Sequence, residues 1–411
     1  MLSSFRGNWG LLNDPSKAGI VEDLDRLSYT SYISHTRRVK SPVDAALKLT
    51  DPHKVGPEQF GFFCPFESPD GANVGLIKHI ASGCIITTEI TATNDELGLK
   101  SDTGFTDISS YFPTMDVTKV FRNNTIVGFH KDPRALYEFL LSERRTKTKL
   151  NFISFYFDVF ANEFHIFTDA GRSMRPLFIV ENIKNAMKKK NKFEIGIDYD
   201  YVELAEINYH LIASDHSKIT KYTRYCEISP LLSLGYYMSS VPFLNHNPSA
   251  RAMLGGQQAK QAIGVYSTKF RDRFDTISYV LHYPQKSLVS TRNVVGIKKN
   301  NIPNGQNIIM AIAAMGYNQE DAVIINKNSA ERGMFAISAF KTLRHELISD
   351  DELRTTVQNV KFMNDNNNNY DDNITLKFEE AAYDNIQDNG LPKLNKNFQD
   401  GDLLLGCMEQ R

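Results

Sequence analysis

The sequence lacks the features that mark several common protein classes. It has four cysteines in 411 residues, and none forms a C-x-x-C pair, so no zinc ribbon is indicated. Scattered cysteines in a chain of this length are typical of a reducing compartment, where thiols serve as small buried apolar groups. No apolar run approaches membrane-spanning length, and no basic segment followed by an apolar one indicates a signal peptide. We therefore expect an intracellular protein without membrane contact.

The motifs of familiar enzyme chemistries are also missing. The chain has no G-x-x-x-x-G-K-[ST] phosphate loop, no G-x-G-x-x-G, and no H-E-x-x-H pair among its ten histidines. This argues against the common ATPases, dehydrogenases and hydrolases. The net charge of -1 excludes a uniformly basic nucleic-acid coat but permits local basic surfaces.

Composition and local pattern predict an α+β protein of several domains. A hydrophobic content of 41% and a charged content of 23% are typical of globular chains, and 411 residues are too many for one core. Asp132 followed by proline predicts a helix start, with Leu136, Phe139 and Leu140 on one apolar face and Arg144 and Arg145 at its C-terminal end. Residues 84–91, 152–157 and 164–167 predict strands, 249–264 a helix, and 266–345 strands with short turns.

Three segments are biased in composition. Residues 183–192 carry five lysines and predict a solvated linker or helix, with nucleic-acid binding or nuclear import as the alternative. Residues 364–373 are rich in Asn and Asp, which predicts a mobile loop insertion. The chain then returns to Gly/Asp turns and an apolar strand at 402–407.

The most informative segment is an acidic turn at Glu320 and Asp321. The apolar runs 308–315 and 322–325 flank the pair, so the pattern predicts a strand, a tight turn and a second strand. Adjacent carboxylates resist burial unless a cation, donors or water satisfy them. The turn therefore either holds a hydrated divalent ion or is a solvated hairpin turn.

Basic residues that suit phosphate contacts occur in three places. Arg37 and Arg38 follow hydroxyl side chains, where they contact phosphates or lie in a solvated turn. Ser249 predicts a helix cap that places Arg251 in the first turn, a geometry that binds phosphate. Lys260 lies on the opposite side of that helix, because nine residues at about 100° each separate it from Arg251. Residues 271–292 interleave basic, hydroxyl and aromatic groups, which suits a nucleic-acid backbone or an exposed sheet edge.

Taken in order, these segments resemble the second-largest, β-like subunit of multisubunit DNA-directed RNA polymerases. Within that family they are most similar to the eukaryotic, archaeal and large-DNA-virus branch. The resemblance covers the chain except for 90–120 and 345–380. Its motifs lie at residues 7–10, 29–38, 63–71 (F-C-P-F-E-S-P-D-G), 75–78, 127–133, 168–177 and 282–286 (H-Y-P-Q-K).

The resemblance implies roles for individual residues. Arg251 is expected to contact the triphosphate of the incoming nucleotide, and Glu320 and Asp321 to lie beside the nucleotide-borne Mg²⁺, with Asp321 as the metal ligand. The aspartates for the permanent catalytic Mg²⁺ are expected in the largest subunit. The expected nucleic-acid contacts are Arg37, Arg38, Lys260, Gln261, Lys286 and Arg292.

It also implies a domain plan and a function. We expect a β-rich fork region (1–82), two external domains (83–182 and 193–240), the first part of a hybrid-binding β-barrel region (241–345), and an insertion with the start of a wall (346–411). The expected partners are the largest and other polymerase subunits, template DNA, the RNA transcript and nucleoside triphosphates, in the nucleus or cytoplasm, or in a virion for a viral chain. Because family members run far longer, we expect a split gene product or fragment, inactive alone. The alternative function is a non-catalytic nucleic-acid-binding or assembly scaffold.

Overall fold

In the computed structural model the chain forms two compact units. The first spans Met1–Lys341 and the second Thr342–Arg411. The residues that the structure describes are 22–41, 43, 45–47, 49–100, 103–110, 117–189, 192–296, 301–344, 360–362, 385–387, 389–405 and 407–409. The predicted Asn-rich segment, 364–373, lies outside them.

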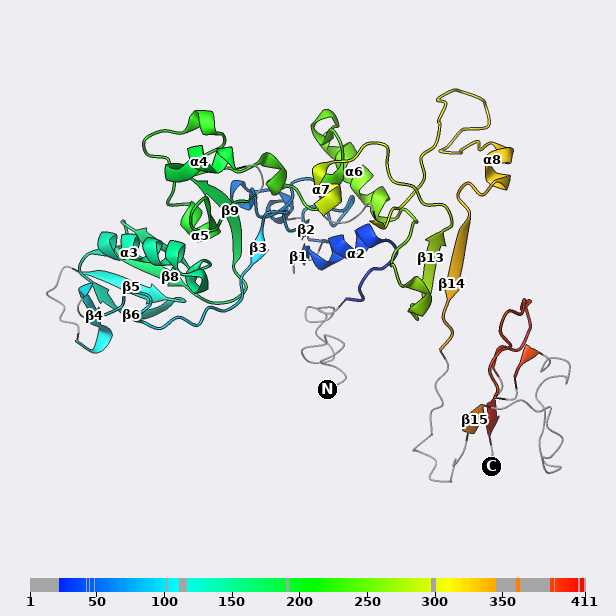
Figure 1. The fold of residues 1–411 in the computed structure, drawn as a ribbon, viewed down its shortest axis with the longest axis horizontal. Coiled ribbons are helices and arrows are strands. Elements are labelled where there is room, and N and C mark those ends of the chain that lie inside the picture. Colours follow the sequence, from blue (N-terminus) through cyan, green and yellow to red (C-terminus); the bar gives the residue numbers. More distant parts are fainter. Residues whose placement is uncertain are drawn as a thin grey trace. The chain divides into compact units, whose positions relative to one another are not determined.

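The first unit mixes strands and helices (Figure 1), which confirms the predicted α+β class. Its strands are β1 Arg38–Lys40, β2 Ile77–His79, β3 Ile85–Ile86, β4 Phe105–Asp107, β5 Thr118–Arg122, β6 Thr125–His130, β7 Ser154–Asp158, β8 Glu163–Phe167, β9 Ser173–Ile179, β10 Tyr199–Glu203, β11 Ile212–Ala213, β12 Tyr225–Cys226, β13 Ile277–Leu281 and β14 Ile337–Lys341. Its α-helices are α2 Tyr29–Thr36, α3 Pro133–Thr146, α4 Ile183–Lys188, α5 Leu204–Ile207, α6 Ser249–Lys260, α7 Arg292–Gly296 and α8 Lys327–Glu331.

Helix α3 covers a five-stranded sheet of order β4-β6-β5-β8-β7. The helix begins where predicted, because the Asp132 carboxylate accepts hydrogen bonds from the backbone N–H groups of Arg134 and Ala135, both at 3.0 Å. Leu136 and Leu140 are buried against the sheet, whereas Phe139 is 38% exposed. Strands β7 and β8 confirm the strands predicted at 152–157 and 164–167, and they pair antiparallel. The sheet and α3 thus share one apolar core.

A second sheet has the order β10-β9-β12-β11, with β3 also pairing to β9. Only Ile85–Ile86 of the strand predicted at 84–91 belongs to it. The lysine-rich segment begins with α4, which confirms the helical alternative as far as Lys188. A buried polar network joins this sheet to α3.

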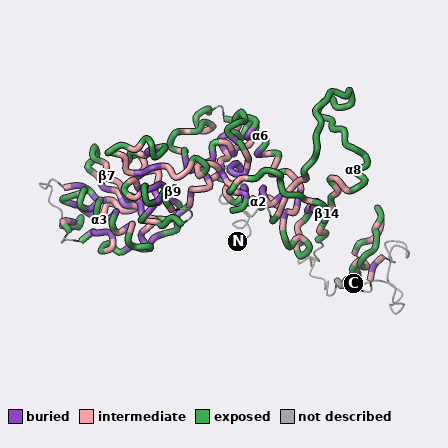
Figure 2. Tube along the Cα trace, turned by 45° about the horizontal axis from the view of Figure 1, so that its top comes forward, coloured by how far each residue is buried: buried purple, intermediate pink, exposed green. Residues whose placement is uncertain are grey.

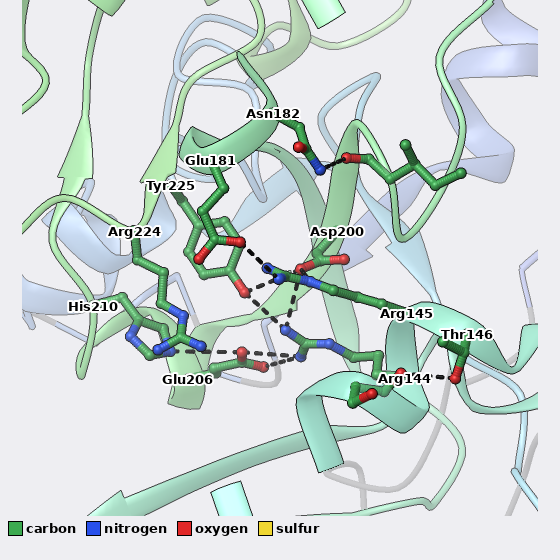
Figure 3. Close-up of polar contacts among 12 residues, drawn as sticks. Arg144, Arg145, Thr146, Glu181, Asn182, Asp200, Glu206, His210, Arg224 and Tyr225 are labelled. Atoms are coloured by element: carbon green, nitrogen blue, oxygen red, sulfur yellow. Dashed lines mark hydrogen bonds and ion pairs between the residues drawn. The ribbon is translucent and has the colours of Figure 1, made fainter. Parts of the chain in front are cut away.

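The centre of that network is the fully buried Arg144 (Figure 3). Its Nη1 donates to both carboxylate oxygens of Glu206, at 2.9 and 2.8 Å, and its Nη2 donates to Tyr225 Oη at 2.8 Å. The neighbouring Arg145 donates from Nε to Asp200 at 3.0 Å. Arg144 and Arg145 were expected merely to suit the helix C-terminus, but Arg144 links α3 to α5 and β12.

Helix α2 packs against α6 and leads into the antiparallel pair β1–β2. The strands β13 and β14 also pair antiparallel, with Ile277 opposite Lys341 and Leu281 opposite Ile337. Most of 266–345 outside these two strands is irregular, so the prediction of strands there holds for β13 and β14 alone among the described residues. No sheet closes into a barrel in the part of the chain that the structure describes.

In the second unit, β15 Val360–Phe362 pairs antiparallel with β16 Cys407–Glu409. The strand predicted at 402–407 therefore begins later, because 402–405 are irregular. Ile386 is fully buried and forms an isolated bridge with Pro392. Across both units, none of the described helices is long and apolar enough to cross a membrane.

Candidate functional site

Helix α6 presents Arg251 to solvent from its first turn, as the sequence predicts. The predicted cap is wrong by one residue: Pro248 occupies the cap position and Ser249 is the first helical residue. Proline at 248 fixes an extended entry into the helix, with φ -59° and ψ 145°, and offers no side-chain acceptor. The first N–H groups of α6 therefore lack a side-chain cap, which leaves the helix N-terminus and Arg251 together as a cationic end.

The body of α6 is anchored in a small apolar core. Ala252 is buried with Cys64, Tyr237, Met238 and Leu244, and Ala259 packs against the same cluster. The Tyr237 hydroxyl donates to the Gly255 carbonyl at 3.4 Å. The apolar core thus fixes one side of the helix, independently of any ligand at its ends.

At the C-terminal end of α6, Lys260 faces the protein. Its Nζ lies 3.0 Å from Oε1 of Glu67, a carboxylate that is 4% exposed. The Lys260 carbonyl accepts a hydrogen bond from Ser28 Oγ at 2.6 Å. Arg251 is exposed and Lys260 largely covered, in line with their predicted places on different sides of the helix. Gln261, just past the helix, is exposed.

Glu320 and Asp321 occupy a turn with left-handed backbone, at φ 54° and 64°. Asn318 closes the loop before them, because its Nδ2 donates to the Ala313 carbonyl at 2.7 Å and its Oδ1 accepts from the N–H of Met315 at 3.1 Å. The predicted turn is confirmed. Both carboxylates are exposed.

The strands predicted on either side of that turn are not formed. Residues 307–328 are all exposed, and Figure 2 shows the part before α8, residues 307–326, as an open loop. Its apolar side chains include Ile309 at 106% exposure and Ile312 at 91%. A strand needs a partner ladder and an apolar face to cover, and the described residues supply neither to this segment.

The remaining basic candidates differ in their surroundings. The guanidinium of Arg37 donates to the carbonyls of Ala81 and Cys84, at 2.7 and 3.1 Å, and stacks on the Tyr236 ring. Arg38 is half-buried, and its Nε has no hydrogen-bond partner among the described residues. Lys286 and Arg292 are exposed, and Arg292 begins α7.

Chemically, the set divides into a cationic helix start and an acidic turn. A guanidinium beside free backbone N–H groups suits a phosphate. Two carboxylates suit Mg²⁺, which takes one or two protein carboxylates together with water and substrate phosphates. No group of three or more His, Cys, Asp or Glu side chains that could hold a metal occurs within the described ranges. Glu320 and Asp321 thus fit a metal ion shared with other ligands, not a closed structural site.

The buried thiols behave as the sequence predicts. Cys64, Cys84 and Cys226 are free and buried. Burial raises the pKa of the Cys84 thiol to about 11 and also raises the pKa of Cys64. These thiols are small core groups, not nucleophiles.

Sequence reasoning assigned no role to Glu67, although the residue lies inside the motif at 63–71. The structure shows a buried carboxylate that contacts Ser34, His79 and Lys260. An acidic residue between two prolines, within a turn-rich motif, was the available indication. Its partners come from distant segments, so their identity could not be read from local spacing.

Comparison with known proteins gives matches along most of the chain. Family models for RNA polymerase Rpb2 match in three places: domain 3 at residues 22–86, domain 4 at 120–181 and domain 6 at 237–411. Among curated proteins, DNA-directed RNA polymerase II subunit 2 of Arabidopsis thaliana is 33% identical over 97% of this chain and 35% of its own length. Subunit RPB2 of Encephalitozoon cuniculi is 30% identical, over 97% of this chain and 36% of its own. Subunit Rpo2 of Sulfolobus acidocaldarius is 30% identical, over 97% and 37%. The chain spans about a third of the length of these relatives.

Proposed function

We propose a function from one premise. This chain belongs to the family of second-largest subunits of DNA-directed RNA polymerases and corresponds to a part of such a subunit. The proposed function is to supply one side of the site at which nucleoside triphosphates are added to an RNA chain on a DNA template. The chain would act in a complex with the largest and other polymerase subunits, in the nucleus or cytoplasm. Alone, it would have no polymerase activity.

The observation that carries this proposal is the exposed Arg251 in the first turn of an anchored helix. Phosphoryl transfer needs positive charge where the pyrophosphate departs. A guanidinium supported by the N-terminus of α6 provides that charge, and the apolar core beneath the helix holds its position. We assign Arg251 to the triphosphate of the incoming nucleotide.

The acidic turn supports a second role. Glu320 and Asp321 would hold, directly or through water, a Mg²⁺ ion that arrives with the nucleotide, and Asp321 is the proposed ligand. When bound, the ion would neutralise phosphate charge during transfer. The exposed carboxylates would keep it close to the departing phosphates.

The exposed loop 307–326 supports the need for partners. Ile309 and Ile312 are almost fully exposed within the continuous apolar run 308–315. An apolar segment of this kind gains about 1.5–3 kcal/mol for each large side chain that it buries. We infer that other parts of the polymerase cover the segment and hold the acidic turn in place.

The nucleic-acid roles proposed for the other residues have unequal support. Gln261, Lys286 and Arg292 are exposed and accessible to a nucleic-acid backbone or RNA end. Arg37 and Arg38 are half-buried, and Arg37 already donates to two carbonyls. We propose that Lys286 and Arg292 make direct backbone contacts and that the fork arginines lie near the DNA.

Reconstitution tests the proposal. The chain is combined with the remaining second-subunit segments, the largest subunit and the other subunits, and RNA synthesis is measured with Mg²⁺. Arg251→Ala should lower kcat/KM for the nucleotide by about 10²-fold or more, because it removes a charged contact that strengthens in the transition state. Arg134→Ala removes another exposed arginine, from α3, and should leave the rate unchanged.

Two results would contradict the assignment. An unchanged nucleotide KM and rate in Arg251→Ala would remove the phosphate role. Salt-dependent DNA binding by a chain that never restores RNA synthesis would favour the non-catalytic module instead.

A further inference from the structure

A buried carboxylate lies behind α6, and neither the family match nor the sequence pattern gives it a role. Glu67 is 4% exposed, and its Oε1 accepts a hydrogen bond from Ser34 Oγ at 2.7 Å. The same oxygen lies 3.0 Å from Lys260 Nζ and 3.9 Å from His79 Nε2. We call Glu67, Ser34, His79 and Lys260 the Glu67 node.

The node joins three separate segments of the chain. Ser34 belongs to α2, His79 to β2, and Lys260 is the last residue of α6. The Ser28 hydroxyl, which caps α2, also donates to the Lys260 carbonyl at 2.6 Å. Both the side chain and the backbone of Lys260 are therefore fixed by the fork region.

Within the node, Lys260 is the group that neutralises Glu67. His79 Nδ1 lies 2.9 Å from the Glu67 carbonyl oxygen, so this nitrogen carries the proton because a carbonyl oxygen can only accept. Burial lowers the pKa of His79 to about 4, and the imidazole is neutral near pH 7. A buried carboxylate without a charged partner is costly, so the Glu67–Lys260 pair stays closed.

The carboxylate also has little room to move. A Cβ atom added at Gly235 would overlap Glu67 Oε2 and would lie 3.3 Å from the Cys64 Cβ. The glycine therefore permits the close approach that holds the carboxylate toward Lys260. Displacing Glu67 would release the C-terminal turn of α6 and shift the helix that carries Arg251, although the Arg251 side chain itself is unaltered.

We propose that Glu67 is a positioning residue that acts through Lys260 to fix α6, and that Lys260 serves this ion pair and does not contact nucleic acid directly. The inference rests on the proposed function, because its consequence is the placement of Arg251 and Gln261 toward the nucleotide and the RNA end. Because α6 is one continuous helix, a shift at Lys260 would move both residues. An error of about 1 Å in a binding group can cost about 10²-fold in rate.

The experiment uses the reconstituted polymerase with Glu67→Gln, Lys260→Met and the double variant. Each single change should lower kcat/KM for the nucleotide by about ten- to a hundredfold. The double variant should be no worse than the more affected single variant, because both changes break one pair. Gly235→Ala, which displaces Glu67 while keeping both charges, should reproduce the loss.

Two controls separate positioning from general destabilisation and from nucleic-acid contact. Glu206→Gln breaks a more deeply buried ion pair between other elements, α3 and α5, and it should leave the nucleotide KM unchanged in polymerase that assembles. The salt dependence of RNA–DNA hybrid binding should be the same in Lys260→Met as in the unaltered protein, because loss of a phosphate contact would lower the log–log slope by about one.

The outcomes are distinguishable. Loss of activity in Arg251→Ala but not in Glu67→Gln overturns the positioning role and leaves the proposed function standing. A reduced salt slope in Lys260→Met overturns the claim that Lys260 makes no nucleic-acid contact. If Arg251→Ala leaves kcat/KM for the nucleotide unchanged, both the proposed function and this inference are wrong.

Discussion

Breaking the buried Arg144–Glu206 pair is the most informative test of the fold. In Glu206→Gln, the Arg144 guanidinium loses a carboxylate that accepts from it at 2.9 and 2.8 Å in a fully buried setting. Burial alone would raise the pKa of Glu206, but Arg144 and the hydrogen bonds from His210 and Arg144 hold it below its ordinary value. The pair is therefore charged near pH 7, and removing one partner costs about 3–5 kcal/mol.

We expect a loss near the lower end, about 3 kcal/mol, because two other partners of Arg144 remain. Its Nη2 lies 3.6 Å from Asp200 and donates to Tyr225 at 2.8 Å. In the double variant Arg144→Met/Glu206→Gln, no unpaired charge is left, since Asp200 keeps Arg145 at 3.0 Å. The two changes should therefore cost about 2 kcal/mol less together than the sum of their separate costs.

Amide hydrogen exchange of the full chain is the suitable assay. A chain with two compact units need not unfold in one step, so local free energies of opening are more informative than one melting curve. Peptides from α3 and β10 should lose protection in Glu206→Gln. The exposed pair Lys119–Glu163, at 3.2 Å in the same first sheet, is the matched control and should matter by less than about 1 kcal/mol.

Two results would refute this reasoning. One is a change in protection below about 1 kcal/mol in Glu206→Gln, since that would mean the pair is solvated or open in solution. The other is strict additivity of the two substitutions, which would show that Arg144 and Glu206 do not stabilise each other.

Three further predictions follow from single residues. The folded pKa of His79 is about 4, below its unfolded value near 6.5, so the stability contributed by the neutral imidazole is present above pH 6.5 and is lost as the pH falls toward 4. Lowering the pH from 7 to 5 should therefore reduce the free energy of unfolding of the unmodified chain by about 2 kcal/mol. In urea unfolding, His79→Gln should remove that pH dependence. Asp132→Ala should destabilise α3 by about 1 kcal/mol, which would be measured as faster hydrogen exchange of its first-turn amides. Glu138→Ala changes an exposed residue on the same helix and should leave that exchange rate unchanged. Gly75→Ala should cost clearly more than Gly71→Ala by thermal melting, because both have positive φ but only the first would drive a Cβ into the His53 carbonyl; equal losses would contradict this steric account.

Local rules predicted α3 because its determinants are adjacent in sequence. Asp132 caps the helix, Pro133 begins it, and Leu136 and Leu140 recur on one face. The same rules placed Arg144 at the C-terminal end of the helix but did not predict its burial. Its burial depends on Glu206, which lies 62 residues further along, and no local spacing encodes such a partner.

The acidic turn shows the opposite limit. The turn itself forms from nearby groups, since Asn318 and the left-handed backbone at Glu320 and Asp321 close it locally. The flanking apolar runs suggested strands because their pattern indicates burial. An apolar run predicts that a segment is covered, but it does not identify what covers it. Among the described residues, no surface covers residues 308–325.

The proposed site therefore has two parts: Arg251 on a helix that the described residues hold in place, and an acidic turn that they do not cover. Arg251 lies on a helix held by the apolar core around Met238 and by the Glu67–Lys260 pair. The acidic turn lies on an exposed loop with few tertiary contacts to oppose its motion. Ordering a backbone costs about 1–2 kcal/mol per residue, and the proposed burial of side chains such as Ile309 and Ile312 on partner segments would offset part of that cost. If the acidic turn binds Mg²⁺ as proposed, formation of that half should be coupled to assembly, and phosphate affinity at Arg251 should arise earlier in assembly than Mg²⁺ affinity at Asp321.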